Sequence, residues 1–159
     1  DTLIGLGNGF DINKAKKPLL IGGGIGIAPL FGLCEAFNKI GIKPTLVFGA
    51  RSANDIVLLE ELEKLANVIV CTDDGTLGFK GNVIECIKQS NIDFDYYYSR
   101  GPLKMLEFLS KAYSNGCVSL EARMGCGFGA CMGCSIKTTK GPQRVCKEGP
   151  VFEATEVIF

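Results

Sequence analysis

From residue 18 to about residue 113, short apolar runs alternate with longer stretches in which apolar residues recur every three or four positions. A short apolar run predicts a buried strand, and the longer period predicts a helix with one buried face. Strands that alternate with helices in this way are typical of a parallel sheet with crossover helices. We therefore expect strands at 18–24, 43–51, 66–74 and 93–99, and helices at 28–41, 54–65, 82–90 and 101–116.

Residues that begin and end helices occur where this order of elements needs them. Gly41 can end the first helix in a left-handed conformation, and Asn54 or Asp55 can cap the start of the second. Strands that are each followed by a helix are typical of a sheet wound in both directions from its centre. The sequence therefore predicts the α/β class, with a doubly wound parallel sheet.

The C-terminal segment has a different pattern. After Cys117 the chain shows no long helical period, and glycines and cysteines are dense. Apolar and polar residues alternate from Val151 onward, which indicates a strand or an extended tail whose apolar side either closes a small core or faces a partner, with the core favoured. We expect a boundary near Val118 and three units, at residues 1–17, 18–117 and 118–159.

Composition and charge narrow the function classes. Of 159 residues, 47% are hydrophobic, which is enough to bury a core. Since 17 basic residues balance 17 acidic ones, we expect no nucleic-acid partner. The apolar runs are too short to span a bilayer, so we expect no membrane partner. Histidine is absent, which removes the commonest general base and most hydrolytic chemistry.

Eight cysteines indicate the compartment and divide into two groups. The sequence shows no signal peptide, so we expect a cytoplasmic protein. In that reducing compartment, clustered thiols indicate metal or redox chemistry more often than disulfides. Four lie in apolar stretches of predicted helices and strands and are interpreted as buried small hydrophobic residues: Cys34, Cys71, Cys86 and Cys117. The other four gather near the C-terminus.

The gathered cysteines follow the spacing C-x4-C-x2-C, with the fourth after eleven further residues: Cys126, Cys131, Cys134 and Cys146. This is the ligand spacing of plant-type [2Fe–2S] ferredoxins. Glycines at 125, 127, 129 and 133 allow the loop to wrap and to direct backbone N–H groups at sulfur. Zinc also accepts four thiolates, but its usual sites pair two short knuckles. We favour an iron–sulfur cluster, then zinc, then disulfides.

A glycine-rich turn joins the first predicted strand to the first predicted helix. The sequence IGGGIGIAPL at 21–30 can direct backbone N–H groups and the helix dipole at a phosphate. The acidic residue that a dinucleotide fingerprint places after the second strand is missing, and Arg51 stands there. The turn is therefore either part of a nucleotide site or a plain tight turn, and Pro29 suits the first turn of the helix in both cases.

Six stretches carry a family resemblance when taken together. They are GNGF at 7–10, LLIGGGIGIAPL at 19–30, FGAR at 48–51, TDDGTLGFKGNV at 72–83, ARMGCGFGACMGC at 122–134 and RVCKEGPVF at 144–152. With them the chain is similar to the ferredoxin–NAD(P) reductase family and, within it, to the electron-transfer subunits of bacterial dihydroorotate dehydrogenase B. The resemblance implies a ferredoxin-reductase-like NAD-binding domain at 18–117 and a small C-terminal [2Fe–2S] domain at 118–159.

The resemblance also implies which residues bind the cofactors. The cluster ligands would be Cys126, Cys131, Cys134 and Cys146. The residues on the pyrophosphate side of NAD would be Gly23, Gly24, Ile25, Gly26 and Pro29. A loop facing the nucleotide cleft, or else a solvated turn, would be formed by Asp73, Asp74 and Gly75. Arg51 and Arg100 would either contact cofactor phosphates or pair with acidic residues on the surface.

The family's reaction is an electron relay. The resemblance implies that dihydroorotate is oxidised at FMN in a catalytic partner subunit, and that electrons pass through the [2Fe–2S] centre to FAD and then to NAD+ in pyrimidine biosynthesis. FAD is expected of a full-length subunit, but the family's FAD-contacting barrel has no counterpart here. Residues 1–17 are expected to be the tail of that barrel, and this chain alone is expected to be inactive.

Two alternatives stay open at this point. The small subunit of an NADH-dependent ferredoxin:NADP oxidoreductase, or of a sulfhydrogenase, combines the same nucleotide domain and C-terminal cluster. From a different class, a zinc-stabilised nucleotide-binding module would have both parts without a redox role. Visible colour that dithionite bleaches would indicate a cluster rather than zinc.

Overall fold

A computed structural model describes residues 7–159 of the chain. The first six positions of the expected tail 1–17 lie outside the described residues. The remainder of that tail runs to the first strand through a short 3-10 turn at Ile12–Lys14. It is fastened to the sheet by the Tyr98 hydroxyl, which donates a hydrogen bond to the carbonyl oxygen of Asp11 at 2.8 Å.

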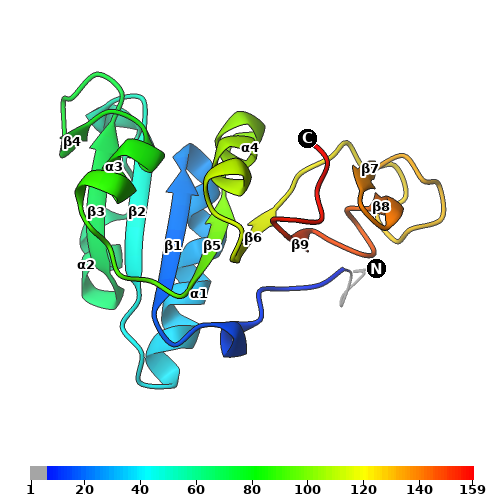
Figure 1. The fold of residues 1–159 in the computed structure, drawn as a ribbon, viewed down its shortest axis with the longest axis horizontal. Helices are drawn as coiled ribbons and strands as arrows, with labels where there is room; N and C mark the ends of the chain where they lie inside the picture. The colour runs from blue at the N-terminus through cyan, green and yellow to red at the C-terminus, as the bar shows by residue number, and fades with distance from the viewer. Residues whose placement is uncertain (1–6) are drawn as a thin grey trace.

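A seven-stranded sheet organises the fold, in the order β4-β3-β2-β1-β5-β6-β9 (Figure 1). All neighbouring strands are parallel except the last pair, β6 and β9, which are antiparallel. The strands are β1 (Pro18–Gly23), β2 (Thr45–Ala50), β3 (Asn67–Thr72), β4 (Phe79–Lys80), β5 (Tyr96–Arg100), β6 (Gly116–Ser119) and β9 (Val151–Glu153). Because β2 and β5 lie on opposite sides of β1, the winding direction reverses there, as the prediction of a doubly wound sheet requires.

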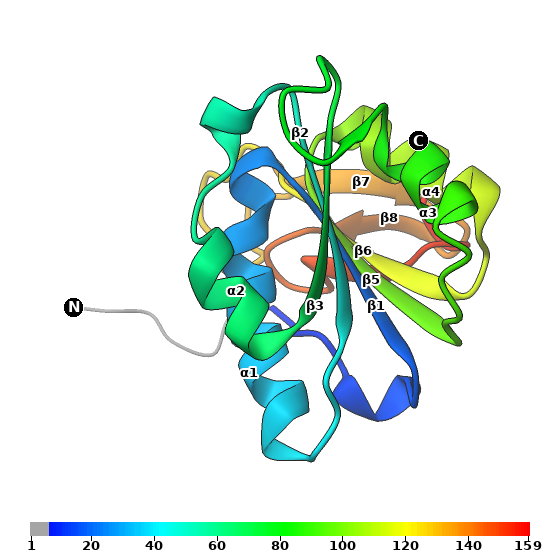
Figure 2. The same cartoon turned by 90° about the vertical axis from the view of Figure 1, so that its left-hand side faces the viewer.

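Two pairs of helices cover the two faces of the sheet (Figure 2). On one face lie α1 (Ile27–Lys39) and α2 (Leu59–Leu65), and on the other lie α3 (Val83–Gln89) and α4 (Leu103–Ala112). Successive side chains of a strand point to opposite faces, so a strand covered on both faces must be apolar at every position. In β1, Leu20 packs into the cluster around α1, while Leu19 and Ile21 pack into the cluster around α3 and α4.

The second helix begins later than the sequence predicts. Instead of starting at Asn54 or Asp55, the chain forms a 3-10 turn at Ala53–Asp55, and α2 begins at Leu59. Ile56 between them is extended and packs against the core, and Leu58 has a φ of 56°. The extended segment around Ile56 thus separates the 3-10 turn from α2 and places a partly buried apolar side chain against the core.

The structure also contains strands that the sequence pattern does not indicate. The expected helix 101–116 ends at Ala112, and Gly116–Ser119 form β6 beside β5. In the C-terminal segment, β7 (Ser135–Thr138) and β8 (Gly141–Arg144) form an antiparallel hairpin. Figure 1 shows this hairpin at the end of the molecule opposite β4.

The C-terminal segment returns to the sheet after the hairpin. β9 pairs with β6, and the Tyr96 hydroxyl of β5 donates hydrogen bonds to both carboxylate oxygens of Glu153 at 3.0 and 2.9 Å. Phe152 and Ala154 are buried in the same cluster as Leu19 of β1, whereas Phe159 is exposed. This part of the tail therefore closes the core. Of the helices that the structure describes, none is long and apolar enough to cross a membrane.

Candidate functional site

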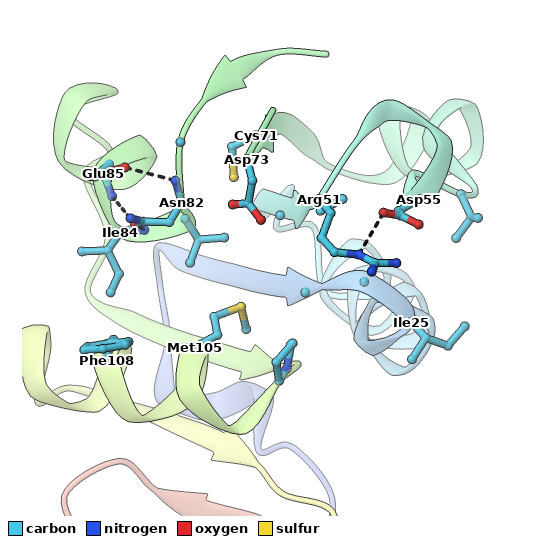
Figure 3. A pocket seen from close by; sticks show the side chains of 18 of the residues that line it. Ile25, Arg51, Asp55, Cys71, Asp73, Asn82, Ile84, Glu85, Met105 and Phe108 are labelled. Carbon is cyan, nitrogen blue, oxygen red and sulfur yellow. Dashed lines mark hydrogen bonds and ion pairs between the residues drawn. The ribbon is translucent and has the colours of Figure 1, made fainter. Parts of the chain in front are cut away.

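A cavity of about 910 Å³ opens at the carboxyl ends of β1, β2 and β3 (Figure 3). It is lined by the glycine turn after β1, by the end of β2 and the loop that follows it, by the end of β3, by the start of α3 and by one side of α4. In doubly wound sheets, ligands bind at the carboxyl ends of the strands next to the point where the winding reverses. The cavity is therefore in the position expected of a nucleotide site.

The glycine turn forms the floor of this cavity. Gly23 has no room for a side chain, since a Cβ atom there would lie 2.7 Å from Cδ of Pro102 and 2.8 Å from the sulfur of Met105. After it, Gly24 takes a φ of 54°, and a 3-10 turn at Gly24–Gly26 leads into α1. The backbone is thus open to a ligand on the cavity side of the turn.

Charged residues lie on the rim that follows β2 and β3. The Arg51 guanidinium pairs with Asp55 at 3.4 Å, and the carboxylate of Asp73 points into the same space (Figure 3). The neighbouring Asp74 differs, since its Oδ1 accepts hydrogen bonds from the backbone N–H and hydroxyl of Thr76 at 2.9 and 2.6 Å. These two bonds, the hydroxyl first, lower the pKa of Asp74. Asp73 thus faces the cavity, while Asp74 stabilises its own turn.

Two parts of the cavity were not identified from the sequence. One is the start of α3, where Asn82 accepts hydrogen bonds from the N–H groups of Ile84 and Glu85 at 3.0 Å, while Glu85 accepts one from the N–H of Asn82 at 3.1 Å. The other is the side of α4 that carries Met105 and Phe108. The capping pattern N-x-x-E was visible in the sequence, but only the sheet order shows that this helix start faces the glycine turn.

The ten predicted nucleotide-binding residues fall into two groups. Those that line the cavity are Gly23, Gly24, Ile25, Arg51 and Asp73. Those outside its lining are Gly26, Pro29, Asp74, Gly75 and Arg100.

Arg100 has a different environment. Its guanidinium donates hydrogen bonds to the carbonyl oxygens of Ser119 and Leu120 at 3.4 and 3.3 Å, and it pairs with Glu121. These contacts join the end of β5 to the segment that enters the cysteine loop.

The four C-terminal cysteines form two close pairs. Sγ of Cys134 and Sγ of Cys146 are 3.3 Å apart, and the backbone N–H of Cys131 lies 3.4 Å from Sγ of Cys126. All eight cysteines of the chain are free thiols. Cys34, Cys71, Cys86 and Cys117 are buried, as predicted from their apolar surroundings.

Backbone N–H groups point at the sulfur atoms of the cysteine loop. Sγ of Cys126 accepts from the N–H of Ala130 at 3.2 Å and from that of Cys131 at 3.4 Å, and Sγ of Cys134 accepts from the N–H of Cys146 at 3.4 Å. Gly127 and Gly129 make this wrapping possible with φ values of 76° and 93°. These amides favour thiolates, because they stabilise negative charge on sulfur.

The pKa values of the thiols follow from these contacts. The backbone N–H groups of Cys131 and Phe128 lower the pKa of Cys126 to about 6. The N–H of Cys146 lowers the pKa of Cys134, while the adjacent Cys134 thiol raises the pKa of Cys146. The loop therefore favours thiolates at Cys126 and Cys134, one in each pair, before any metal is bound.

The paired arrangement fits a centre with two metal positions. The spacing of these cysteines along the chain differs from the two short knuckles that are usual in zinc sites. Two pairs of thiolates with N–H groups directed at sulfur fit a [2Fe–2S] cluster, whose four thiolate ligands are shared between two irons.

Known families match both parts of the chain. Residues 121–158 match the iron–sulfur cluster binding domain of dihydroorotate dehydrogenase B, and residues 20–70 match the oxidoreductase NAD-binding domain. The cysteine loop and the glycine turn thus lie in separately recognised domains.

Individual proteins resemble the chain over nearly its whole length. The dihydroorotate dehydrogenase B (NAD(+)) electron transfer subunit of Fusobacterium nucleatum subsp. nucleatum is 42% identical over 99% of this chain, and that of Shouchella clausii is 40% identical over 100%. The chain spans 64% and 65% of the lengths of these two relatives. A chain in the structure of an NADH-dependent reduced ferredoxin–NADP oxidoreductase superposes with a TM-score of 0.88 at 30% identity, covering 99% of this chain and 59% of that one.

Proposed function

The chain belongs to the family of dihydroorotate dehydrogenase B electron-transfer subunits, and on that premise we propose that it binds NAD and a [2Fe–2S] cluster and relays electrons toward NAD+. The observation that carries the proposal is the cysteine loop, where two thiol pairs are surrounded by N–H donors beside a nucleotide-type sheet. When bound, the cluster and a flavin supply one-electron transfer, and NAD+ accepts a hydride.

The chain's own residues have distinct tasks in this proposal. Cys126 and Cys131 hold one iron, and Cys134 and Cys146 hold the other. The turn at Gly23 and Gly24 supports the pyrophosphate of NAD, because its backbone is open to the cavity. On the opposite rim, Arg51 and Asp73 provide one cationic and one anionic contact for the nucleotide.

A catalytic partner is part of the proposal. It is an FMN-containing subunit that oxidises dihydroorotate, and FAD lies between the cluster and NAD in the complete assembly. The surface around the cysteine loop supports this, since the side chains of Met124, Phe128 and Met132 are about half exposed there, at 52%, 53% and 49%. Apolar side chains gathered on one exposed loop are typical of a contact surface. We place this assembly in the cytoplasm, because free thiols persist in reducing compartments.

A second candidate is the small subunit of an NADH-dependent ferredoxin:NADP oxidoreductase. The superposition with a chain of such an enzyme favours it. The dihydroorotate system is preferred, because its relatives are 42% and 40% identical to this chain, against 30% for that chain. Co-purification with an FMN-containing dehydrogenase, or instead with a larger iron–sulfur subunit, separates the two.

Anaerobic reconstitution with iron and sulfide tests the cluster. After reduction with dithionite, we expect an EPR signal of a [2Fe–2S] centre, with about two irons per chain. A Cys134→Ser variant serves as the matched comparison and should lose the signal. A colourless protein that contains zinc and gives no EPR signal would instead identify a zinc-stabilised nucleotide-binding module.

NADH oxidation tests whether the chain acts alone. We propose that residues 1–159 by themselves do not reduce an artificial acceptor with NADH, because the residues that the structure describes form a nucleotide-type sheet and a cysteine segment, and neither is a flavin-binding barrel. Bound flavin and diaphorase activity are measured on the purified chain. Robust activity with a stoichiometric flavin would refute this part of the proposal.

A further inference from the structure

Arg144 and Glu148 form an ion pair beside the fourth cysteine. Arg144 is the last residue of β8, and Glu148 lies in the turn that follows Cys146. Oε2 of Glu148 accepts hydrogen bonds from the backbone N–H of Arg144 at 2.7 Å and from its Nε at 3.0 Å, and a guanidinium nitrogen contacts Oε1. The two side chains are joined in a planar, two-point arrangement.

The pair also connects the two halves of the cysteine loop. A second guanidinium nitrogen of Arg144 donates a hydrogen bond to the carbonyl oxygen of Gly129, between Cys126 and Cys131. The aliphatic part of Lys147 lies against the same glycine, where a Cβ atom would be 2.7 Å from Cδ of the lysine. Arg144 therefore joins the loop of the first cysteine pair to the turn that carries Cys146.

Both members of the pair keep their charge near neutral pH. Their side chains are only 21% and 30% exposed. A guanidinium and a carboxylate that are hydrogen-bonded to each other are both ionised near pH 7. Arg144 lies opposite Ser135, the residue after Cys134, in the β7–β8 pairing, and its guanidinium reaches the carbonyl oxygen of Gly129 in the cysteine loop, whereas the Glu148 carboxylate bonds to Arg144. The cation is thus the inner charge, and the carboxylate is the outer one.

From this arrangement we propose that the Arg144–Glu148 pair sets the reduction potential of the cluster, with Arg144 raising it and Glu148 partly cancelling that effect. The inference rests on the proposed function. One-electron reduction by dithionite or by the partner adds one negative charge to the cluster and breaks no bond. A nearby cation stabilises that charge and a nearby anion opposes it, so the two residues act in opposite directions.

The test is an EPR-monitored redox titration of the reconstituted protein with single substitutions. Arg144→Gln should make the midpoint potential more negative, by about tenfold in the one-electron equilibrium constant, or about 59 mV. Glu148→Gln should shift it in the positive direction. Arg144→Lys keeps the charge but not the two-point geometry, so its potential should stay close to that of the unchanged protein. Lys140→Gln, which breaks the Lys140–Glu156 pair elsewhere in the segment, is the matched control and should not shift the potential.

The outcomes separate this inference from the proposed function. If no [2Fe–2S] signal forms in the unsubstituted chain, the proposed function fails. If the signal forms and both glutamine variants shift the potential in the same direction, or neither shifts it, the pair is only structural and the inference is overturned. Should Arg144→Gln lose the cluster, Glu148→Gln decides alone, and an unchanged or more negative potential contradicts the inference.

Discussion

The backbone N–H of Asp73 donates a hydrogen bond to the carbonyl oxygen of Ala50 at 3.1 Å. The first residue after β3 therefore lies beside the last residue of β2. A dinucleotide fingerprint expects an acid at the end of β2, and this sequence has Arg51 there instead. The neighbouring strand thus brings a carboxylate to the place where the second strand lacks one.

Asp73→Asn should weaken NADH binding by about tenfold, because a charge-assisted hydrogen bond to a ribose hydroxyl contributes about 1.5–3 kcal/mol. The same change should weaken NADPH binding less, since it removes a negative charge that repels a 2′-phosphate. Equilibrium binding of both nucleotides provides the measurement. Asp74→Asn is the control, because that carboxylate is held by Thr76 outside the cavity. Equal losses in the two variants would argue against a ligand contact by Asp73.

Asn82→Ala should destabilise the protein by about 1 kcal/mol, since it removes the side-chain cap of α3. The start of this helix lines the cavity, so nucleotide binding should weaken as well. Urea unfolding measures the first effect and nucleotide titration the second. Asn82→Asp keeps an acceptor for the same N–H groups and should restore most of the stability. A fully stable alanine variant would mean that the cap contributes little.

Asn8→Ala should loosen the turn that follows Cys146. The Asn8 side chain donates to the carbonyl oxygens of Glu148 and Val151 at 3.0 and 2.8 Å and accepts from the N–H of Val151 at 2.9 Å. Losing these bonds at an exposed site should cost about 1–2 kcal/mol. Hydrogen exchange at residues 147–152 should accelerate, and the cluster should be lost faster in the presence of a chelator. Asn13→Ala removes only local contacts to Asp11 and should change neither rate.

The carboxylate of Asp95 gives stability a defined pH dependence. Burial raises its pKa, but the N–H groups of Lys17 and Lys16, each at 2.9 Å, together outweigh burial and lower it below the ordinary 3.8. A lowered pKa in the folded state means that the stabilisation is complete above 3.8 and is lost as the pH falls through the folded-state value. The effect is limited to about 1 kcal/mol, since the group is exposed to solvent.

Asp95→Asn should therefore reduce the free energy of unfolding at pH 6 and have little effect near pH 2. Urea unfolding at a series of pH values measures this difference. Asp93→Asn removes only an exposed pair with Lys17 and leaves both backbone hydrogen bonds to Asp95 in place, so it should lower the free energy of unfolding less than Asp95→Asn does. A constant difference between Asp95→Asn and the unchanged protein at all pH values would contradict the interpretation.

The sequence predicts the strands and helices that have their own hydrophobic pattern along the chain. β1, β2, β3 and β5 are apolar on both faces, and their helices have clear periods. The two-residue strand β4 has no pattern of its own, because it exists only through its pairing with Cys71 and Thr72. Similarly, Gly116–Ser119 is a strand because β5 and β9 lie on either side of it.

The candidate site also has one part that the sequence predicts and one part that only the fold creates. The cysteine loop is visible in the sequence because its ligands and glycines lie close together along the chain. The cavity is assembled from the ends of three strands and from two helices, so its α3 and α4 walls depend on the order in which these elements pack. The contact of Arg144 with the cysteine loop has no signature in the sequence, since only the fold brings its guanidinium to the carbonyl oxygen of Gly129.

The return of β9 to the sheet has a consequence for how the two parts of the chain depend on each other. All four residues of β6 are buried, and β9 covers the side of β6 that β5 does not. A nucleotide-binding fragment cut at residue 117 would divide this strand and expose an unpaired, apolar sheet edge, which is a template for aggregation. The cysteine segment therefore protects the sheet edge of the nucleotide-type part, so the two parts share one continuous sheet.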